Sequence, residues 1–262
     1  MIRLSIQDRL LPGETIQEKW DAARRYGFDA VELQTLDIPE AARQARAAGI
    51  PVSAICAGYR GWLIDPDLEQ VAIAREDIKR LLEVGAEIDA GCIVVPIYGR
   101  SRNLPDNGTG RSKQEDERVF LEGMRELAGH AEKVGGTLHL EAINRYENDL
   151  CVTVADSMRL REQIGSPRVT TMGDVFHMNI EEPDLGASLE SAGEHLGYVH
   201  LADSQRLEPG NGHLDFRNVF EALDRMGYQG YASLECHLSG PSDEVLPRSV
   251  EFLRSQMPAA VA

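Results

Sequence analysis

The stretch TLHLEAINRYEN, residues 137–148, combines an apolar run with charged side chains. Leu138, Leu140 and Ile143 are typical of a buried β-strand. The same run contains the carboxylate of Glu141, and burying an unpaired carboxylate is strongly unfavourable. Either this segment is not a buried strand or a cation lies at its end, and the rest of the sequence favours the cation.

Seven further short runs have the same largely apolar character, and longer amphipathic stretches separate them. Such runs are typical of parallel strands that are covered on both faces. The eight predicted strands are residues 2–6, 29–34, 51–56, 92–98, 137–143, 169–174, 197–203 and 231–236. Asp65 and Pro66 predict the start of a helix over residues 66–84. Thr153 and Asp156 have the spacing of a helix capping box.

Eight strand-then-helix units in 262 residues match the size and rhythm of a closed barrel. A weak internal repeat supports this, because ARRYGFDAVEL (23–33) and LDRMGYQGYASLE (223–235) each run from a helix end through a glycine and a strand to a glutamate. We therefore predict an α/β fold, a (β/α)8 TIM barrel forming a single domain over residues 1–262. A doubly wound open sheet is the alternative, but no glycine-rich phosphate turn follows the first strand.

Composition and charge exclude several classes of protein. The net charge of −16 repels phosphate backbones, so we expect no nucleic-acid partner. No apolar run approaches the roughly 20 residues of a membrane helix, and the N-terminus is too polar for a signal peptide. We therefore expect a cytoplasmic protein without a membrane partner. The four cysteines form no CxxC pair, which disfavours a zinc knuckle or a redox motif.

Each of the last four predicted strands carries a possible metal ligand near its carboxyl end: Glu141, Asp174, His200 and Glu235. Any one of them alone is more often a salt-bridge partner or a helix cap. Consecutive strands are neighbours in a closed barrel, so the four side chains should converge at the end where barrel active sites lie. Three carboxylates and one imidazole favour Mn²⁺, or alternatively Mg²⁺ or Co²⁺, over a structural zinc. Open coordination positions would remain for a carbonyl and a hydroxyl of a sugar.

Four motifs resemble the xylose-isomerase-like sugar isomerase and epimerase barrels, and most closely the ketose 3-epimerases that act on tagatose and allulose. They are EAINRYEN (141–148), GDVFHMNIEE (173–182), VHLADSQRLEPGNGHLDF (199–216) and YASLEC (231–236). The resemblance implies a divalent-metal-dependent isomerase that interconverts ketoses, at C3, by proton transfer through an enediolate. It also implies a small-molecule sugar substrate and a homodimer or homotetramer.

The resemblance implies roles for particular residues. It makes Glu141, Asp174, His200 and Glu235 the metal ligands. It makes Glu147, His177 and Arg206 substrate-binding residues. Because Glu141 and Glu235 come from the fifth and eighth strands, we predict that they flank the substrate and also act as the catalytic proton carriers.

Plainer interpretations remain open for the substrate-binding residues. Arg206 could steady the enediolate, hold a phosphate or form a surface salt bridge near Glu208. Glu147 could pair with Arg145 instead of binding substrate. His177 could be a hydrogen-bonded histidine just past its strand.

His139 lies two residues before Glu141 and should point to the same side of the strand, into the barrel. We favour a hydrogen-bonded core histidine. The alternative makes it the base of a lyase, because related barrels are the catalytic subunits of C-glycoside deglycosidases, which act on 3-keto C-glycosides with a small second subunit. An aldose–ketose isomerase, a ketose-phosphate epimerase and a non-catalytic sugar-binding barrel also remain open. Two loops, 58–67 and 99–116, could wall or cover the site.

Overall fold

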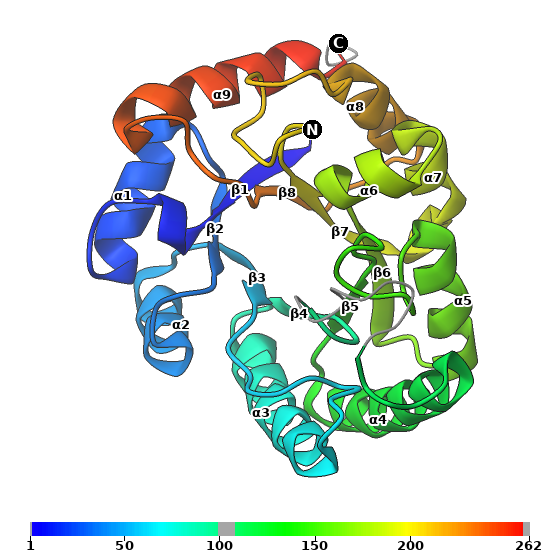
Figure 1. The fold of residues 1–262 in the computed structure, drawn as a ribbon. Coiled ribbons are helices and arrows are strands. Elements are labelled where there is room, and N and C mark those ends of the chain that lie inside the picture. The colour runs from blue at the N-terminus through cyan, green and yellow to red at the C-terminus, as the bar shows by residue number, and fades with distance from the viewer. Residues whose placement is uncertain (1, 99–107, 259–262) are drawn as a thin grey trace.

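The computed structural model describes residues 2–98 and 108–258 of the chain. In this part, eight parallel strands follow one another around a closed barrel, each pairing with the next and β8 pairing with β1 (Figure 1). The strands are β1 (Arg3–Gln7), β2 (Ala30–Leu33), β3 (Val52–Cys56), β4 (Gly91–Val94), β5 (Leu138–Glu141), β6 (Val169–Asp174), β7 (Leu196–Leu201) and β8 (Tyr231–Leu234). The predicted barrel is confirmed, and most strands are shorter than the apolar runs that predicted them.

The helices surround the ring of strands (Figure 1). They are α1 (Ile16–Tyr26), α2 (Ile38–Ala48), α3 (Leu68–Glu87), α4 (Lys113–Val134), α5 (Val154–Ile164), α6 (Val175–Glu181), α7 (Leu185–Ser191), α8 (Phe216–Arg225) and α9 (Ser242–Gln256). Short 3₁₀ helices occupy Asp8–Leu10 and Gly193–His195. Two helices, α6 and α7, follow β6, where the repeating pattern predicts one. The predicted loop over 99–116 ends in the first turn of α4, and its residues 99–107 lie outside the described part.

Local capping interactions set the helix ends. Thr153 and Asp156 form the predicted capping box at the start of α5. The predicted start of the third helix is wrong: Asp67, not Asp65, caps α3, because the Asp67 side chain accepts the Glu69 amide. The carboxylate of Asp65 instead accepts the amide of Asp67 and shapes the turn before the helix.

Most of the apolar core lies between the strands and the surrounding helices, and a smaller apolar cluster is separate from it. The smaller cluster consists of Ala54, Cys56, Ile93, Met172 and Tyr198. Its members come from β3, β4, β6 and β7. Since β3 and β7 face each other across a ring of eight strands, this cluster fills the barrel interior. It forms a packed floor beneath the carboxyl ends of the strands.

Among the residues that the structure describes, no helix combines the length and the apolar character that crossing a membrane requires.

Candidate active site

The structure brings the four predicted metal ligands together. Glu141, Asp174, His200 and Glu235 each offer one ligand atom, and these atoms all lie within 4.8 Å of one another. Glu141 and Asp174 end β5 and β6, His200 lies in β7 and Glu235 directly follows β8. Parallel pairing from β5 to β8 carries these positions to the same end of the barrel. Their role as metal ligands stays a prediction, but their convergence is a feature of the fold.

His200 occupies the centre of this cluster and is fully buried. Its Nδ1 atom lies 3.1 Å from Oε2 of Glu235, 3.3 Å from Oε1 of Glu141 and 4.0 Å from Oδ2 of Asp174. All three carboxylates therefore face one nitrogen of one ring. A cation bound between these oxygens and Nδ1 would have ligands from four strands.

Asp174 supplies the observation that tests whether a divalent cation fits. Its Oδ1 atom accepts the amides of Phe176 and His177 and so caps α6. Its Oδ2 atom is buried and lies 3.5 Å from Nη1 of Arg206, but no residue that the structure describes donates a hydrogen bond to it. A buried carboxylate oxygen without a donor is unfavourable. Together with the other three ligand atoms, it fits a cation that prefers oxygen, such as Mn²⁺ or Mg²⁺.

The two predicted proton carriers have opposite electrostatic environments. Burial raises the pKa of Glu141 to about 7. Burial also acts to raise the pKa of Glu235, but the positive charges of His200 and Arg206 outweigh it and hold this pKa well below its usual value. Pairs of carboxylates whose surroundings separate their pKa values are typical of acid–base catalysis.

Arg206 and His177 lie against the cluster. Nη2 of Arg206 donates to Oε2 of Glu235 at 2.8 Å, and Nη1 lies 3.1 Å from Nε2 of His177. The backbone amide of Asn144 donates to Nδ1 of His177, and burial lowers the pKa of His177 to about 4. Because both side chains make these contacts and line the cavity over the cluster, both belong to the site. Arg206 also has a φ of +60°, a left-handed conformation that is unusual for a non-glycine residue.

The sequence offered Glu208 as an alternative partner for Arg206 and Arg145 as one for Glu147, and both of these side chains form other contacts. Glu208 accepts hydrogen bonds from Ser239 and Asn211 and so is not the partner of Arg206. Arg145 forms its ion pair with Glu181.

Glu147 is half-buried and is not among the residues that line the central cavity. It lies near enough to Tyr98 for its charge to contribute, after burial, to the raised pKa of that phenol. Glu147 therefore lies near Tyr98, which lines the cavity, and is not one of the four clustered residues.

A cavity of about 390 Å³ opens over the cluster. Glu141, Glu235, His177 and Arg206 form part of its polar lining, and Tyr59, Trp62 and Tyr98 form an aromatic wall. Trp62 contacts both tyrosines, with ring centroids 6.1 and 6.2 Å apart. Tyr59 and Trp62 come from the loop 58–67, one of the two loops that the sequence suggested could wall or cover the site. Their place in the wall suits the apolar face of a sugar ring.

His139 points into the barrel as predicted but lies apart from the four clustered residues. Its Nδ1 atom is hydrogen-bonded to Oγ1 of Thr170 at 2.7 Å, and its ring stacks on Tyr198 at 5.4 Å. Burial lowers its pKa to about 4. Tyr198 in turn contacts His200 edge-on. The histidine is therefore a packed, hydrogen-bonded side chain beneath the cluster.

Sequence reasoning missed several polar residues of the site. Glu32, on β2, is fully buried and lies 3.1 Å from Nε2 of His200. Gln7, at the end of β1, donates to Glu235. Arg9, Gln34 and His237 line the cavity. A glutamate within the apolar run 29–34 was a visible signal for Glu32, and the internal repeat that includes it pointed to this position.

The fold and this cluster define a class of protein, the barrels that carry polar catalytic groups at the carboxyl ends of their strands. Residues 20–256 match the family described as xylose isomerase-like TIM barrel, and the chain belongs to this family.

The chain is 34% identical over 240 residues to 3-dehydro-D-guloside 4-epimerase of Escherichia coli (strain K12). The aligned region covers 89% of this chain and 92% of that protein. It is 32% identical over 241 residues to L-ribulose 3-epimerase of Mesorhizobium japonicum, covering 88% and 79%. The crystal structure of a 3-keto-D-glucoside 4-epimerase from E. coli superimposes with a TM-score of 0.91 at 32% identity, covering 97% of this chain and all of that chain. These relatives are epimerases.

Proposed function

We propose that this protein is a divalent-metal-dependent sugar epimerase that inverts a carbon next to a ketone, with C3 of a ketose as the first candidate. The observation that carries the proposal is the convergence of Glu141 and Glu235, with Asp174 and His200, at the base of one cavity. The named activities of the relatives support it. L-ribulose 3-epimerase and 3-dehydro-D-guloside 4-epimerase each invert a carbon beside a carbonyl.

Glu141, Asp174, His200 and Glu235 would hold the cation, for which we propose Mn²⁺, with Mg²⁺ or Co²⁺ as alternatives. When bound, the cation would supply Lewis-acid stabilisation of the negative charge that develops on the sugar oxygens. The same four side chains would fix the position of the sugar relative to the proton carriers.

Glu141 and Glu235 would carry out the proton transfers. One carboxylate removes the proton from the carbon beside the ketone, and the other delivers a proton to the opposite face of that carbon. The direction of the reaction exchanges their roles. Each such proton transfer typically contributes a factor of about 10²–10⁴.

Arg206 and His177 would contact the sugar oxygens near the reacting carbon. The guanidinium of Arg206 lies over the ring of Phe176, at 4.6 Å, and within 2.8 Å of Glu235. This placement suits stabilisation of an enediolate oxygen. The buried setting of Arg206, among carboxylates, gives less support to a phosphate-binding role. Glu147 would act at the rim of the cavity, on a more distant hydroxyl.

A 3-keto glycoside inverted at C4 is the second candidate substrate. The similarity to an E. coli 4-epimerase, found both in sequence and in a solved structure, supports it. The lyase alternative, with its small second subunit, has less support, because His139 is hydrogen-bonded to Thr170 and packed under Tyr198. We further propose a cytoplasmic homodimer or homotetramer.

Incubation in D₂O tests this function. Mn²⁺-loaded enzyme is mixed with ketoses, ketose phosphates and 3-keto glycosides, and deuterium is located by NMR. We expect deuterium at C3 of a ketose or at C4 of a 3-keto glycoside, together with the epimer. Deuterium at C1 or C2 would instead indicate an aldose–ketose isomerase. The absence of exchange with every sugar would contradict the proposal.

A further inference from the structure

We propose that Glu32 is a positioning residue, which orients the His200 ring so that Nδ1 faces the cation site. This inference rests on the proposed function, because it concerns the same metal centre. It assigns a role to β2, a strand that contributes none of the four clustered ligands.

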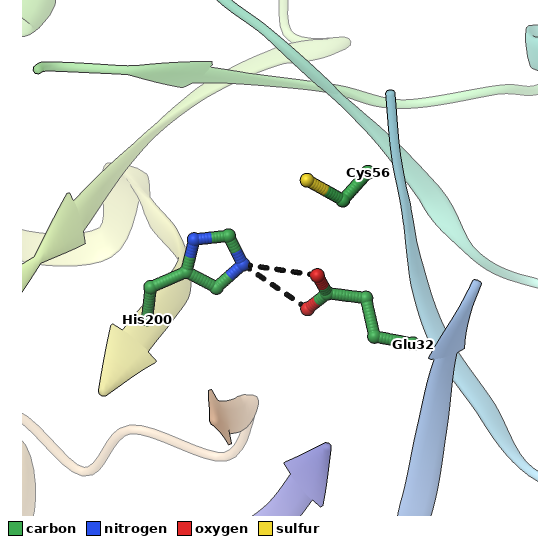
Figure 2. A group of neighbouring side chains, drawn as sticks. All are labelled: Glu32, Cys56 and His200. Carbon is green, nitrogen blue, oxygen red and sulfur yellow. Dashed lines mark hydrogen bonds and ion pairs between the residues drawn. The ribbon is translucent and has the colours of Figure 1, made fainter. Parts of the chain in front are cut away.

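The two nitrogens of His200 face different groups. Nδ1 faces the carboxylates of Glu141, Asp174 and Glu235. Nε2 lies 3.2 and 3.1 Å from Oε1 and Oε2 of Glu32, on the opposite edge of the ring (Figure 2). When histidine binds a metal through one nitrogen, a carboxylate on the other N–H fixes its tautomer and orientation. Glu32 occupies the place of that carboxylate.

Glu32 is itself held rigidly. Nε2 of Gln7 donates to its Oε1 atom at 2.8 Å, and the hydroxyl of Tyr198 donates to its Oε2 atom at 2.7 Å. Gln7 lies opposite Glu32 in the pairing of β1 with β2. With His200, each oxygen of the fully buried carboxylate has a donor. Since a buried carboxylate is tolerated only when its hydrogen bonds are made, Glu32 has little freedom to move.

The same network reaches a proposed proton carrier. Nε2 of Gln7 also lies 3.0 Å from Oε1 of Glu235, so one amide group joins Glu32 to Glu235. Nε of Arg9 donates to Oε1 of Gln7 at 2.7 Å, which fixes the orientation of that amide. Strands β1 and β2 thereby support ligands that come from β7 and from the end of β8.

Glu32, Cys56 and His200 also lie close enough together to suggest a second cation site (Figure 2). The hydrogen bonds argue against it. Nε2 of His200 contacts both oxygens of Glu32 directly, and Tyr198 and Gln7 donate to the same two oxygens. The two groups differ in their donors. Gln7 and Tyr198 already donate to the two oxygens of Glu32, whereas Oδ2 of Asp174 has no hydrogen-bond donor among the described residues.

The test measures Mn²⁺ binding by electron paramagnetic resonance of the free ion, with wild type, Glu32→Ala and Glu32→Gln. We expect Glu32→Ala to weaken Mn²⁺ affinity about 10–100-fold. Glu32→Gln should lose less, because its amide oxygen can still accept the N–H of Nε2. A folded protein with a purely structural Glu32 would bind Mn²⁺ equally well in all three forms, and that result would overturn the inference.

Ser157→Ala is the matched control. Ser157 is a buried residue of α5 whose hydroxyl donates to the backbone of β5. We expect wild-type Mn²⁺ affinity for this variant, and an equal loss of affinity would overturn the inference. Should Glu32→Ala fail to fold, Tyr198→Phe removes one donor to Glu32 and should weaken Mn²⁺ binding measurably. Wild-type affinity in that variant and in Glu32→Gln would again overturn it.

The number of Mn²⁺ ions bound per chain separates the two interpretations of the group Glu32, Cys56 and His200. We expect one Mn²⁺ per chain in wild type and in Cys56→Ala. Two ions in wild type and one in Cys56→Ala would overturn the inference, since Glu32 would then be a ligand. A wild-type protein that binds no Mn²⁺ would contradict the proposed function itself, whereas wild-type affinity in Glu32→Ala would contradict only the role of Glu32.

Discussion

Two residues of β5 lie two positions apart and have opposite surroundings. The ring of His139 stacks on Tyr198, and its Nδ1 atom is hydrogen-bonded to Oγ1 of Thr170. Burial lowers the pKa of His139 to about 4. Glu141 lies against His200, and burial raises its pKa to about 7. The same strand thus carries a packing residue near its start and the proposed proton carrier at its end. Position along the strand, more than residue type, decides which side chain can do chemistry.

Two glycines lie close to the His139–Thr170 pair, at an end of the barrel where a second cavity of about 360 Å³ opens. A Cβ atom on Gly91 would lie 2.1 Å from Nε2 of His139, and one on Gly197 would lie 2.2 Å from Oγ1 of Thr170. Both glycines therefore leave room for the His139–Thr170 pair. The Glu141 end has no such fit, since Asp174 leaves a buried oxygen without a donor among the described residues. The His139–Thr170 pair is closely packed, whereas the Glu141 end is suited to receive a ligand.

Removing divalent metal should have the largest effect and should act on the Glu141 end alone. We expect exhaustive chelation to abolish turnover and Mn²⁺ to restore it. Since ligand binding stabilises the folded state, saturation with Mn²⁺ at about 100 times its Kd should add about 2.7 kcal/mol to the unfolding free energy. Turnover assays and thermal unfolding before and after chelation measure both effects. Full activity in metal-free protein would contradict the account.

Glu141→Gln and Glu235→Gln should each lower turnover by at least about 10²–10⁴-fold, because each removes a proton carrier and a charged ligand. Circular dichroism should show an intact fold.

Glu208→Gln is the control for these two variants, because it also changes a buried carboxylate, one that bonds Ser239 and Asn211 outside the cluster. It should keep its turnover even if it loses stability. Normal turnover in either purified cluster variant would contradict the assigned roles.

Arg206→Ala should lower turnover by about 10²-fold, the effect of deleting one donor that stabilises developing negative charge. Arg206→Lys should recover part of the loss, because it keeps the charge but not the paired geometry. Steady-state kinetics on the epimerised sugar give the measurement. An Arg206→Ala enzyme with wild-type kcat/KM would make this residue a structural partner of Glu235 only.

His139→Asn should have the smallest effect on catalysis. We expect turnover near that of wild type and a loss of about 1–3 kcal/mol in unfolding free energy, since a buried hydrogen bond and a ring contact are disturbed. Denaturant unfolding and the epimerase assay measure the two quantities. Loss of epimerase turnover in a stable His139→Asn protein would remove the distinction between the two ends of the strand.

The sequence was sufficient for the barrel because the apolar runs and helix signals repeat locally. It was also sufficient for the positions of the four clustered residues. Each ends or nearly ends a strand, and neighbouring parallel strands must bring such residues together, as they do for Glu141 and Asp174. The sequence predicted the start of α3 two residues early, because Asp65 and Asp67 are both capable caps and only the backbone path selects between them.

Partnerships across the barrel could not be predicted from the sequence. Glu32 lies 168 residues from His200 in the chain, and its burial makes sense only once Gln7 and Tyr198 are seen to donate to it. Likewise, Arg206 pairs with Glu235, 29 residues away, and not with Glu208, two residues away. Closure of the ring brings these distant residues together, and local sequence patterns carry no record of it.

An anomalous difference map from crystals grown with Mn²⁺ tests the central claim most directly. The account predicts one strong peak at the carboxyl end of the barrel, within bonding distance of Glu141, Asp174, Nδ1 of His200 and Glu235. A map with no peak at that position, or with its only strong peak bound by other residues, would contradict it.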